Sequence, residues 1–471
     1  MFGLDTGFTL LLILCLLAAF AFEFINGFHD TANAVATVIY THSLKPSTAV
    51  IWSGIWNFIG VNVGGIAVAI GIINLLPTEI IVDQNLRHNI AMIFALIITA
   101  IIWNLATWYI GLPCSSSHTL IGSIFGVGLA FMLLPGNHGI ALNWKKVEDA
   151  GLSLLFSPIF GFGLAFLLMF ILNLTIKNKM IFKEPPAKKP PPMWIRSILI
   201  FTSTSVSFAH GSNDGQKGVG LVMLILIGFS PAFFSVDRGK NPAHLLTNVR
   251  KIEWTLGKVD TTVLKGNDKT KYTILNAKID SMKLMLTGTT SFNQISDKDH
   301  FRLRKDIFFV ARETDGLLTR NTTKGMPGLT RMEVKVLQSN IKQFRTYTEY
   351  APQWVILFIS LALGLGTMVG WKRIVVTIGE KIGKTHLTYA QGASANLVAA
   401  STIIASSFFG LPVSTTHVLT SGIAGTMVAG KGKKNLSIKT LQNIAIAWII
   451  TLPLTILLSG GLFLLFRWIL N

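Results

Sequence analysis

The sequence predicts an all-α protein that crosses a membrane several times and carries one water-soluble, mostly helical insertion. Of the 471 residues, 51% are hydrophobic and only 13% are charged, whereas soluble proteins carry about 25% charged residues. The charge is also concentrated, because residues 236–350 hold 21 Lys/Arg and 12 Asp/Glu while the other 356 residues hold 20 and 10. The apolar part contains the same pair of motifs twice, which predicts two related halves.

A transmembrane helix needs about 20 mostly apolar residues. The candidate segments are 8–25, 48–76, 90–110, 119–135, 151–176, 194–210, 219–236, 353–371, 386–409, 418–430 and 440–466. Segments such as 194–210 and 418–430 are too short to cross alone, and others contain polar clusters. This pattern is typical of broken helices and helical hairpins that line a cavity within the protein. Because residues 1–10 contain no basic residue, we do not interpret the first segment as a signal peptide.

Two pairs of motifs reveal the internal repeat. FINGFHD at residues 24–30 resembles FAHGSND at 208–214, at an offset of 184 residues. GLPCSSSH at 111–118 resembles GLPVSTTH at 410–417, at an offset of 299 residues. The two offsets differ by 115 residues, which is the length of the charged segment. Removing that segment therefore brings both pairs to one common offset.

The repeat predicts the domain organisation. It consists of a first membrane half at 1–190, ending in a basic Pro-rich loop, a second half at 191–235 and 351–471, and an insertion at 236–350. Secondary transporters build a mid-membrane site from such repeats, in parallel or in inverted orientation. The excess of Lys and Arg in 177–196 and 431–439 predicts that these loops are cytoplasmic. We expect the insertion on the same side and the C-terminus outside.

The Asp motifs at 26–33 and 210–217 predict polar breaks in the membrane helices, and Asp30 and Asp214 occupy equivalent positions in them. A carboxylate inside a membrane segment costs roughly 2.5–3.5 kcal/mol on insertion scales, so it usually marks an ion or proton path. The alternative is a carboxylate satisfied by local amides as a helix cap. Asn33 and Asn213 add amide and carbonyl groups that suit a cation or an oxyanion, and Glu23 is a further candidate for binding a coupling ion.

The second motif pair predicts an anion site. Pro113 and Pro412 end the preceding helices. Hydroxyl residues then begin the next helices: Ser115, Ser116 and Ser117 in the first half, and Ser414, Thr415 and Thr416 in the second. A helix N-terminus presents free N–H groups and about half a positive charge, which favours phosphate. Simple N-capping explains a single motif equally well, but its occurrence in both halves favours one shared site.

Four further residues near these motifs are secondary candidates for the site. His118 and His417 match in the two halves and suit either an anion contact, proton binding or a structural role. Lys217 suits either neutralisation of an anion, pairing with Asp214, or extension of its charge toward the membrane surface. Gln216 stands beside it.

Several functions are not predicted. The sequence has no phosphate-binding loop for ATP and no Cys/His spacing of a fixed zinc site. Ser116 and His118 are two residues apart and would not face each other on a helix, so no hydrolase pair is expected. The net charge of +19 falls in short runs between apolar segments, which does not favour nucleic-acid binding. We therefore expect neither enzymatic activity nor a cofactor.

The four motifs together resemble those of the PiT inorganic phosphate transporters, and most of all the low-affinity bacterial Pit permeases. The resemblance covers both membrane halves but not the sequence of the insertion. It implies a homodimeric cation-coupled phosphate symporter of two inverted repeats in the bacterial plasma membrane. It also implies that phosphate lies between the paired hydroxyl motifs, and that the paired Asp motifs serve phosphate and the coupling cation.

The coupling ion is predicted from the same resemblance. Asn57 and Asn396 stand where sodium-coupled eukaryotic relatives carry glutamates. The similar bacterial permeases are proton-coupled and take phosphate as a neutral complex with a divalent metal such as Mg²⁺, which lowers the charge carried through a low-dielectric site. We predict H⁺ symport. The alternatives are Na⁺ coupling, transport of another oxyanion, or a non-transporting receptor that senses phosphate through its insertion.

Overall fold

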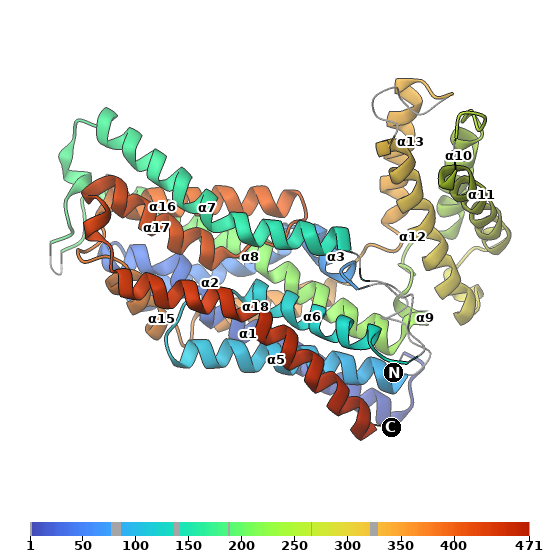
Figure 1. The fold of residues 1–471 in the computed structure, drawn as a ribbon, viewed down its shortest axis with the longest axis horizontal. Helices are drawn as coiled ribbons and strands as arrows, with labels where there is room; N and C mark the ends of the chain where they lie inside the picture. The colour runs from blue at the N-terminus through green and yellow to red at the C-terminus, as the bar shows by residue number, and fades with distance from the viewer. Residues whose placement is uncertain are drawn as a thin grey trace. The chain divides into compact units, whose positions relative to one another are not determined.

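The structure is a computed structural model that describes residues 2–76, 86–135, 142, 144–186, 189–264, 266–320 and 328–470. This part of the chain forms helices (Figure 1) and divides into two compact units. The membrane unit comprises residues 8–228 and 351–471, and the insertion unit comprises 1–7 and 229–350. The predicted all-α membrane fold is confirmed.

The membrane unit contains the two halves found in the sequence. The first half consists of α1 (Thr6–Tyr40), α2 (Pro46–Val63), α3 (Ala67–Ile73), α5 (Leu86–Tyr109), α6 (Ser116–Met132), α7 (Trp144–Thr175) and the short η1 (Lys179–Phe182). The second consists of α8 (Met193–Phe229), α14 (Gln353–Thr367), α15 (Lys372–Val376), η3 (Thr377–Lys381), α16 (Tyr389–Phe408), α17 (Thr415–Lys431), η4 (Lys433–Asn435) and α18 (Ile438–Leu470).

Several helices satisfy the length and composition of a membrane span. Among the described residues α1, α5, α7 and α18 do so alone, and counting two bent pairs as one span each gives up to six. The bent pairs are α2 with α3, bent by 72°, and α14 with the segment Lys372–Lys381, bent by 57°. α8 has 37 residues, which is about 55 Å of helix, but polar residues interrupt its centre. α6 has only 17 residues, about 25 Å, so it starts within the membrane thickness instead of crossing it.

The two Asp motifs lie inside continuous helices, α1 and α8. The sequence prediction of a helix break at these motifs is wrong. Their glycines serve close packing, since a Cβ on Gly27 would lie 2.5 Å from the Leu363 carbonyl oxygen of α14, and one on Gly211 would meet the Asn57 backbone of α2. Small residues at helix crossings are the usual way for membrane helices to approach closely.

The predicted breaks do occur at the two Gly-Leu-Pro motifs. Gly111 and Gly410 adopt φ values of +71° and +66°, a left-handed conformation that ends α5 and α16. The following amide returns to a carbonyl of the last turn at 3.0 Å in the first half and 2.9 Å in the second. Ser115 and Ser414 then cap α6 and α17. Each half therefore contains a helical hairpin whose tip is determined by local sequence.

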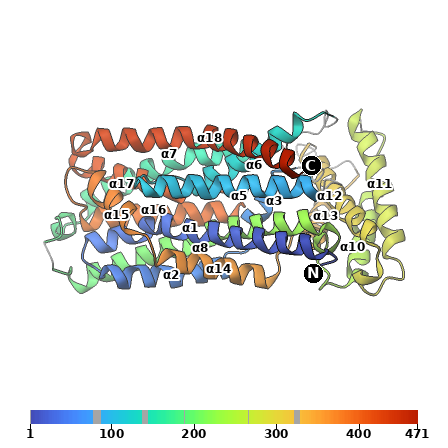
Figure 2. The same cartoon turned by 90° about the horizontal axis from the view of Figure 1, so that it is seen from below.

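Equivalent helices of the two halves run in opposite directions, and each half packs one long helix against the hairpin of the other half. α1 and α8 are antiparallel, as are α7 and α18 (Figures 1 and 2). α18 of the second half packs along the α5–α6 hairpin of the first, and α7 of the first half packs along the α16–α17 hairpin of the second. This reciprocal packing brings the two hairpins together in the centre of the unit.

The two basic loops lie at one end of the membrane unit. Lys431 donates to Glu184 at 2.6 Å, which joins the end of α17 to the Pro-rich loop; Lys188 of that loop lies outside the described residues. The end of α8 and the start of α14, where the insertion joins, lie at the opposite end (Figure 2). The prediction that the insertion shares a side with the basic loops therefore disagrees with the helix directions.

The insertion unit has its own core. Its elements are α9 (Pro231–Phe234), α10 (Pro242–Leu256), α11 (Asn267–Leu286), η2 (Phe292–Gln294), α12 (Asp297–Arg320) and α13 (Arg331–Arg345). Two of these helices bury residues three or four positions apart, as amphipathic helices do. These are Leu275, Ile279, Met282 and Leu286 of α11, and Leu337, Ile341 and Phe344 of α13.

Candidate functional site

The tips of the two helical hairpins meet in the centre of the membrane unit. The Ser117 hydroxyl donates to the Val413 carbonyl at 2.9 Å. The rings of His118 and His417, which follow the two hydroxyl runs, are 4.6 Å apart between centroids. The N-termini of α6 and α17 therefore converge, and each contributes free N–H groups and partial positive charge to the same place.

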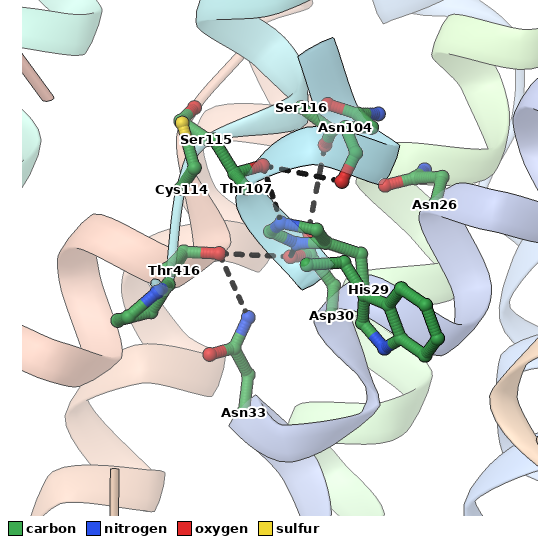
Figure 3. Close-up of polar contacts among 12 residues, drawn as sticks. Asn26, His29, Asp30, Asn33, Asn104, Thr107, Cys114, Ser115, Ser116 and Thr416 are labelled. Atoms are coloured by element: carbon green, nitrogen blue, oxygen red, sulfur yellow. Dashed lines mark hydrogen bonds and ion pairs between the residues drawn. The ribbon is translucent and has the colours of Figure 1, made fainter. Parts of the chain in front are cut away.

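Asp30 lies directly at this convergence (Figure 3). One of its carboxylate oxygens accepts from Thr416 at 2.9 Å and lies 3.0 Å from His29 Nδ1. The other accepts from Thr415 at 3.3 Å and from Ser116 at 3.4 Å. One carboxylate of the first half thus accepts hydrogen bonds from hydroxyl groups of both hairpins.

Asp214 lies on the other side of Ser116, whose hydroxyl is also 3.4 Å from Asp214 Oδ2. His210 Nε2 lies 3.5 Å from Asp214 Oδ2 and 3.7 Å from Asp30 Oδ2. One ligand atom from each of Asp30, His210 and Asp214 lies within 4.8 Å of the others. Although 184 residues separate them, the two acids form one buried cluster with the dimensions of a cation site.

The remaining hydroxyl and amide candidates divide into two groups. Ser115 and Ser414 accept from the backbone amides of His118 and His417 at 3.2 Å and 3.1 Å, so they act as N-caps. Asn33, in contrast, faces the cluster and donates to Thr416 at 3.0 Å. The capping interpretation therefore applies to the first residue of each hydroxyl run, while Ser116, Thr415 and Thr416 face the carboxylates.

Asn213 and Gln216 contact bends of the backbone and not the carboxylates. Asn213 donates to Ser407 at 2.9 Å, at the end of α16. Gln216 accepts from the Val68 amide at 2.7 Å and donates to the Gly64 carbonyl at 2.9 Å, which bridges the bend between α2 and α3. These two residues position the elements around the cluster.

The sequence prediction did not single out His29 and His210. Besides its contact with Asp30, His29 lies 3.2 Å from Thr107 of α5. His210 lies 3.0 Å from Asn57, and Asn57 donates to Thr367 at 2.8 Å. The repeat held a signal for both residues, because each seven-residue motif contains one histidine, at a different position in each half.

Glu23 and His417 are buried beside the cluster. Glu23 accepts from Asn26 at 3.1 Å, and among the described residues its second oxygen has no hydrogen-bond donor. The His417 ring stacks on Trp448 at 3.9 Å, and neither ring nitrogen has a hydrogen-bond partner in the part of the chain that the structure describes. Both residues retain unused proton-binding capacity.

A cavity of about 630 Å³ adjoins the first hairpin. It is lined by Gly111 of the hairpin and by basic residues of α15 and η3, including Lys372, Arg373 and Lys381. Thr377 donates to the Gly111 carbonyl at 2.8 Å across this region. The cavity is thus a positively charged depression beside the hairpin tip that also carries Ser116.

Comparison with known proteins now identifies the family. Residues 26–459 match the phosphate transporter family, PHO4. The chain belongs to the phosphate transporter family. It is 42% identical to the low-affinity inorganic phosphate transporter PitB of Escherichia coli and 41% identical to PitA of the same species, in each case over 98% of this chain and 97% of the relative. A low-affinity inorganic phosphate transporter of Buchnera aphidicola is 40% identical over the same shares.

A solved structure supports the fold assignment. The sodium-dependent phosphate transporter superposes with a TM-score of 0.55 at 21% identity and covers 98% of this chain and 99% of its own. At this identity the likeness concerns the fold. Together with the family match, it makes the protein a multi-pass membrane transporter of inorganic phosphate, and the predicted resemblance is confirmed.

Proposed function

We propose that this phosphate transporter is a symporter that takes up inorganic phosphate together with H⁺, with phosphate travelling as a neutral complex with a divalent metal such as Mg²⁺. The proposal depends on one observation: two hydroxyl-bearing helix N-termini meet two buried carboxylates. In this proposal Ser116, Ser117, Thr415 and Thr416 donate to the phosphate oxygens. The convergent N-termini favour its negative charge.

The carboxylates make a cation obligatory. Asp30 and Asp214 are 2% and 0% exposed, and phosphate beside them would add like charge in a low-dielectric environment. A cation that enters with phosphate removes this repulsion, so anion and cation bind together or not at all. Asp30 is the carboxylate that such a cation would contact, with His210 Nε2 3.7 Å away.

The neutral residues around the cluster favour H⁺ over Na⁺. Asn57 and Asn396 carry no charge, and Asn396 donates to Thr37 at 2.7 Å. The acids left to take up a proton are Asp30 and Glu23, both buried. We also propose that the protein catalyses no chemical transformation and lies as a homodimer in the bacterial inner membrane.

The decisive experiment is uptake of labelled phosphate by proteoliposomes under an imposed pH gradient. We expect gradient-driven uptake that requires Mg²⁺, does not require Na⁺ and is not matched by labelled sulfate. Uptake driven only by a Na⁺ gradient would replace H⁺ as the coupling ion. Mg²⁺-independent uptake would exclude the neutral complex, and absence of any gradient-dependent uptake would exclude symport.

The topology belongs to the same proposal. We propose that the basic loops lie in the cytoplasm, that the two halves are inverted repeats and that the insertion is attached outside. The opposite helix directions support this topology. Single cysteines introduced into the insertion should react with a membrane-impermeant thiol reagent in intact cells, because Cys15 and Cys114 are buried and stay silent. Reaction only after membrane disruption would reverse the orientation. The mass of nanodisc particles tests the dimer.

A further inference from the structure

Lys217 is a buried cation in the middle of a membrane helix. Its side chain lies in α8, 12 residues before the end of that helix at Phe229, or about 18 Å along the axis. It is 1% exposed, and this depth prevents the ammonium from reaching the membrane surface. Its Nζ lies 2.8 Å from Asp214 and donates to Ser117 at 2.5 Å. The lysine is part of the central cluster.

The internal repeat shows what the first half has at this position. At the offset of 184 residues, Lys217 corresponds to Asn33, and at the offset of 299, Ser117 corresponds to Thr416. Asn33 donates to Thr416 at 3.0 Å, as Lys217 donates to Ser117. The two contacts are equivalent in the repeat, but the donor is neutral in the first half and positively charged in the second.

This single difference gives the two carboxylates different charge partners. Asp214 is paired with an ammonium that is part of the protein. Asp30 has no Lys or Arg in ion-pair contact among the described residues, and its ionisable neighbours are His29 and His210. With phosphate bound, Asp30 therefore still needs a positive charge from outside, whereas Asp214 does not.

We propose that Lys217 is a tethered cation that permanently fills the cation position of the second half. Besides the metal of the neutral phosphate complex, one mobile cation then enters at Asp30, and none enters at Asp214. This inference rests on the proposed symport and specifies its stoichiometry: the chain itself supplies one of the two positive charges that a symmetric site would take from solution.

Replacing Lys217 with asparagine gives the second half the residue that the first half has at the equivalent position. In Lys217→Asn, Asp214 loses its internal partner and must take a second mobile cation when phosphate binds. The ionisable groups around the vacated position are Glu23 and Asp30 on α1, His118 on α6, and His210 and Asp214 on α8. Phosphate binding to the variant should therefore depend more steeply on pH or on an added cation.

The test is equilibrium binding of labelled inorganic phosphate to the full chain in nanodiscs, measured over a pH series and, at fixed pH, over Na⁺ and Mg²⁺ series. For Lys217→Asn we expect the slope of log Kd against pH to increase by about one proton, or a new dependence on Na⁺ or Mg²⁺. Lys217→Arg keeps the charge and should keep the wild-type slopes. Lys431→Gln, which removes an exposed lysine, is the matched control.

A double variant guards against misfolding. Asp214→Asn with Lys217→Asn removes both charges and leaves a neutral pair, so it should bind phosphate with wild-type cation slopes. A steeper slope in this variant overturns the proposal. So does a Lys217→Asn protein whose affinity falls equally under all conditions, because the lysine would then contact phosphate or only pack. If the wild-type protein shows no cation-dependent phosphate binding, the proposed symport fails instead.

Discussion

The hairpin of the first half ends in three serines and contacts Lys217 of the second half. The hairpin of the second half ends in Ser414, Thr415 and Thr416 and contacts Asn33 of the first half. The backbone of the two hairpins is nearly the same, with a left-handed glycine, a proline and a serine cap in each. The charged groups around them are not the same. Asp214 has Lys217 at 2.8 Å, whereas among the described residues Asp30 has only histidines within ion-pair distance.

The difference shows which features of the site benefit from symmetry. A tetrahedral anion accepts hydrogen bonds from all sides, so two opposed sets of hydroxyl and N–H donors suit it. The number of positive charges, in contrast, is fixed by the two carboxylates and by the anion. One half can therefore supply a cation permanently while the other half takes it from solution.

The largest predicted effect is a difference in folding stability between variants of the two carboxylates. Asp214→Asn leaves the buried Lys217 ammonium without a partner, which should cost about 3–5 kcal/mol of folding stability. Asp30→Asn removes an acceptor whose histidine neighbours can become neutral, and should cost about 1–3 kcal/mol. Equilibrium unfolding in mixed micelles measures both, and Lys431→Gln serves as reference. Equal losses would contradict the asymmetry.

A smaller effect is expected for the hydroxyls that face the cluster. Ser116 lies between both carboxylates, whereas Thr415 reaches only Asp30. Removing either hydroxyl from a charged site should cost about 1.5–3 kcal/mol, which is roughly 10- to 100-fold in phosphate affinity. We expect Ser116→Ala to lose more affinity than Thr415→Val in nanodisc binding assays. The reverse order would place phosphate nearer the second hairpin.

The two bent helix pairs should differ in their effect on the rate of phosphate transport. Residues 46–73 contain no charged residue, whereas the bend after α14 is followed by Lys372 and Lys381, which line the cavity beside the first hairpin. Lys372→Gln with Lys381→Gln should slow phosphate transport about 3- to 10-fold at low ionic strength and less at high salt. Lys433→Gln with Lys434→Gln removes the same charge elsewhere. Equal slowing by both pairs would mean that only net charge matters.

The smallest predicted effect is the loss of one helix N-cap, and it should be the same in both halves. Ser115→Ala and Ser414→Ala each remove one N-cap, at a cost of about 1 kcal/mol. Thermal unfolding of the two variants should therefore shift by similar amounts, with little change in the pH dependence of phosphate binding. A loss of binding limited to one variant would show that this serine contacts phosphate as well as capping its helix.

The sequence predicted the class of fold and most members of the cluster. Low charge, the common motif offset and the Gly-Leu-Pro-x-Ser pattern were enough to predict the two halves, the hairpins and the pairing of Asp30 with Asp214. It did not distinguish Ser115, a cap, from Ser116, which faces both acids. It also wrongly expected helix breaks at the Asp motifs, because glycine weakens a helix in water but serves close packing between membrane helices.

The sequence by itself determined the features that depend on near neighbours: the ends of helices, the caps and the period of apolar residues, because the hydrogen bonds involved span only a few positions. Only the tertiary structure decided which charges meet. Three features depend on how distant helices cross. These are the pairing of Lys217 with Asp214, the position of His210 between two acids, and the packing of α7 and α18 against the hairpin of the opposite half. Those crossings follow from packing of the whole unit, which no local pattern specifies.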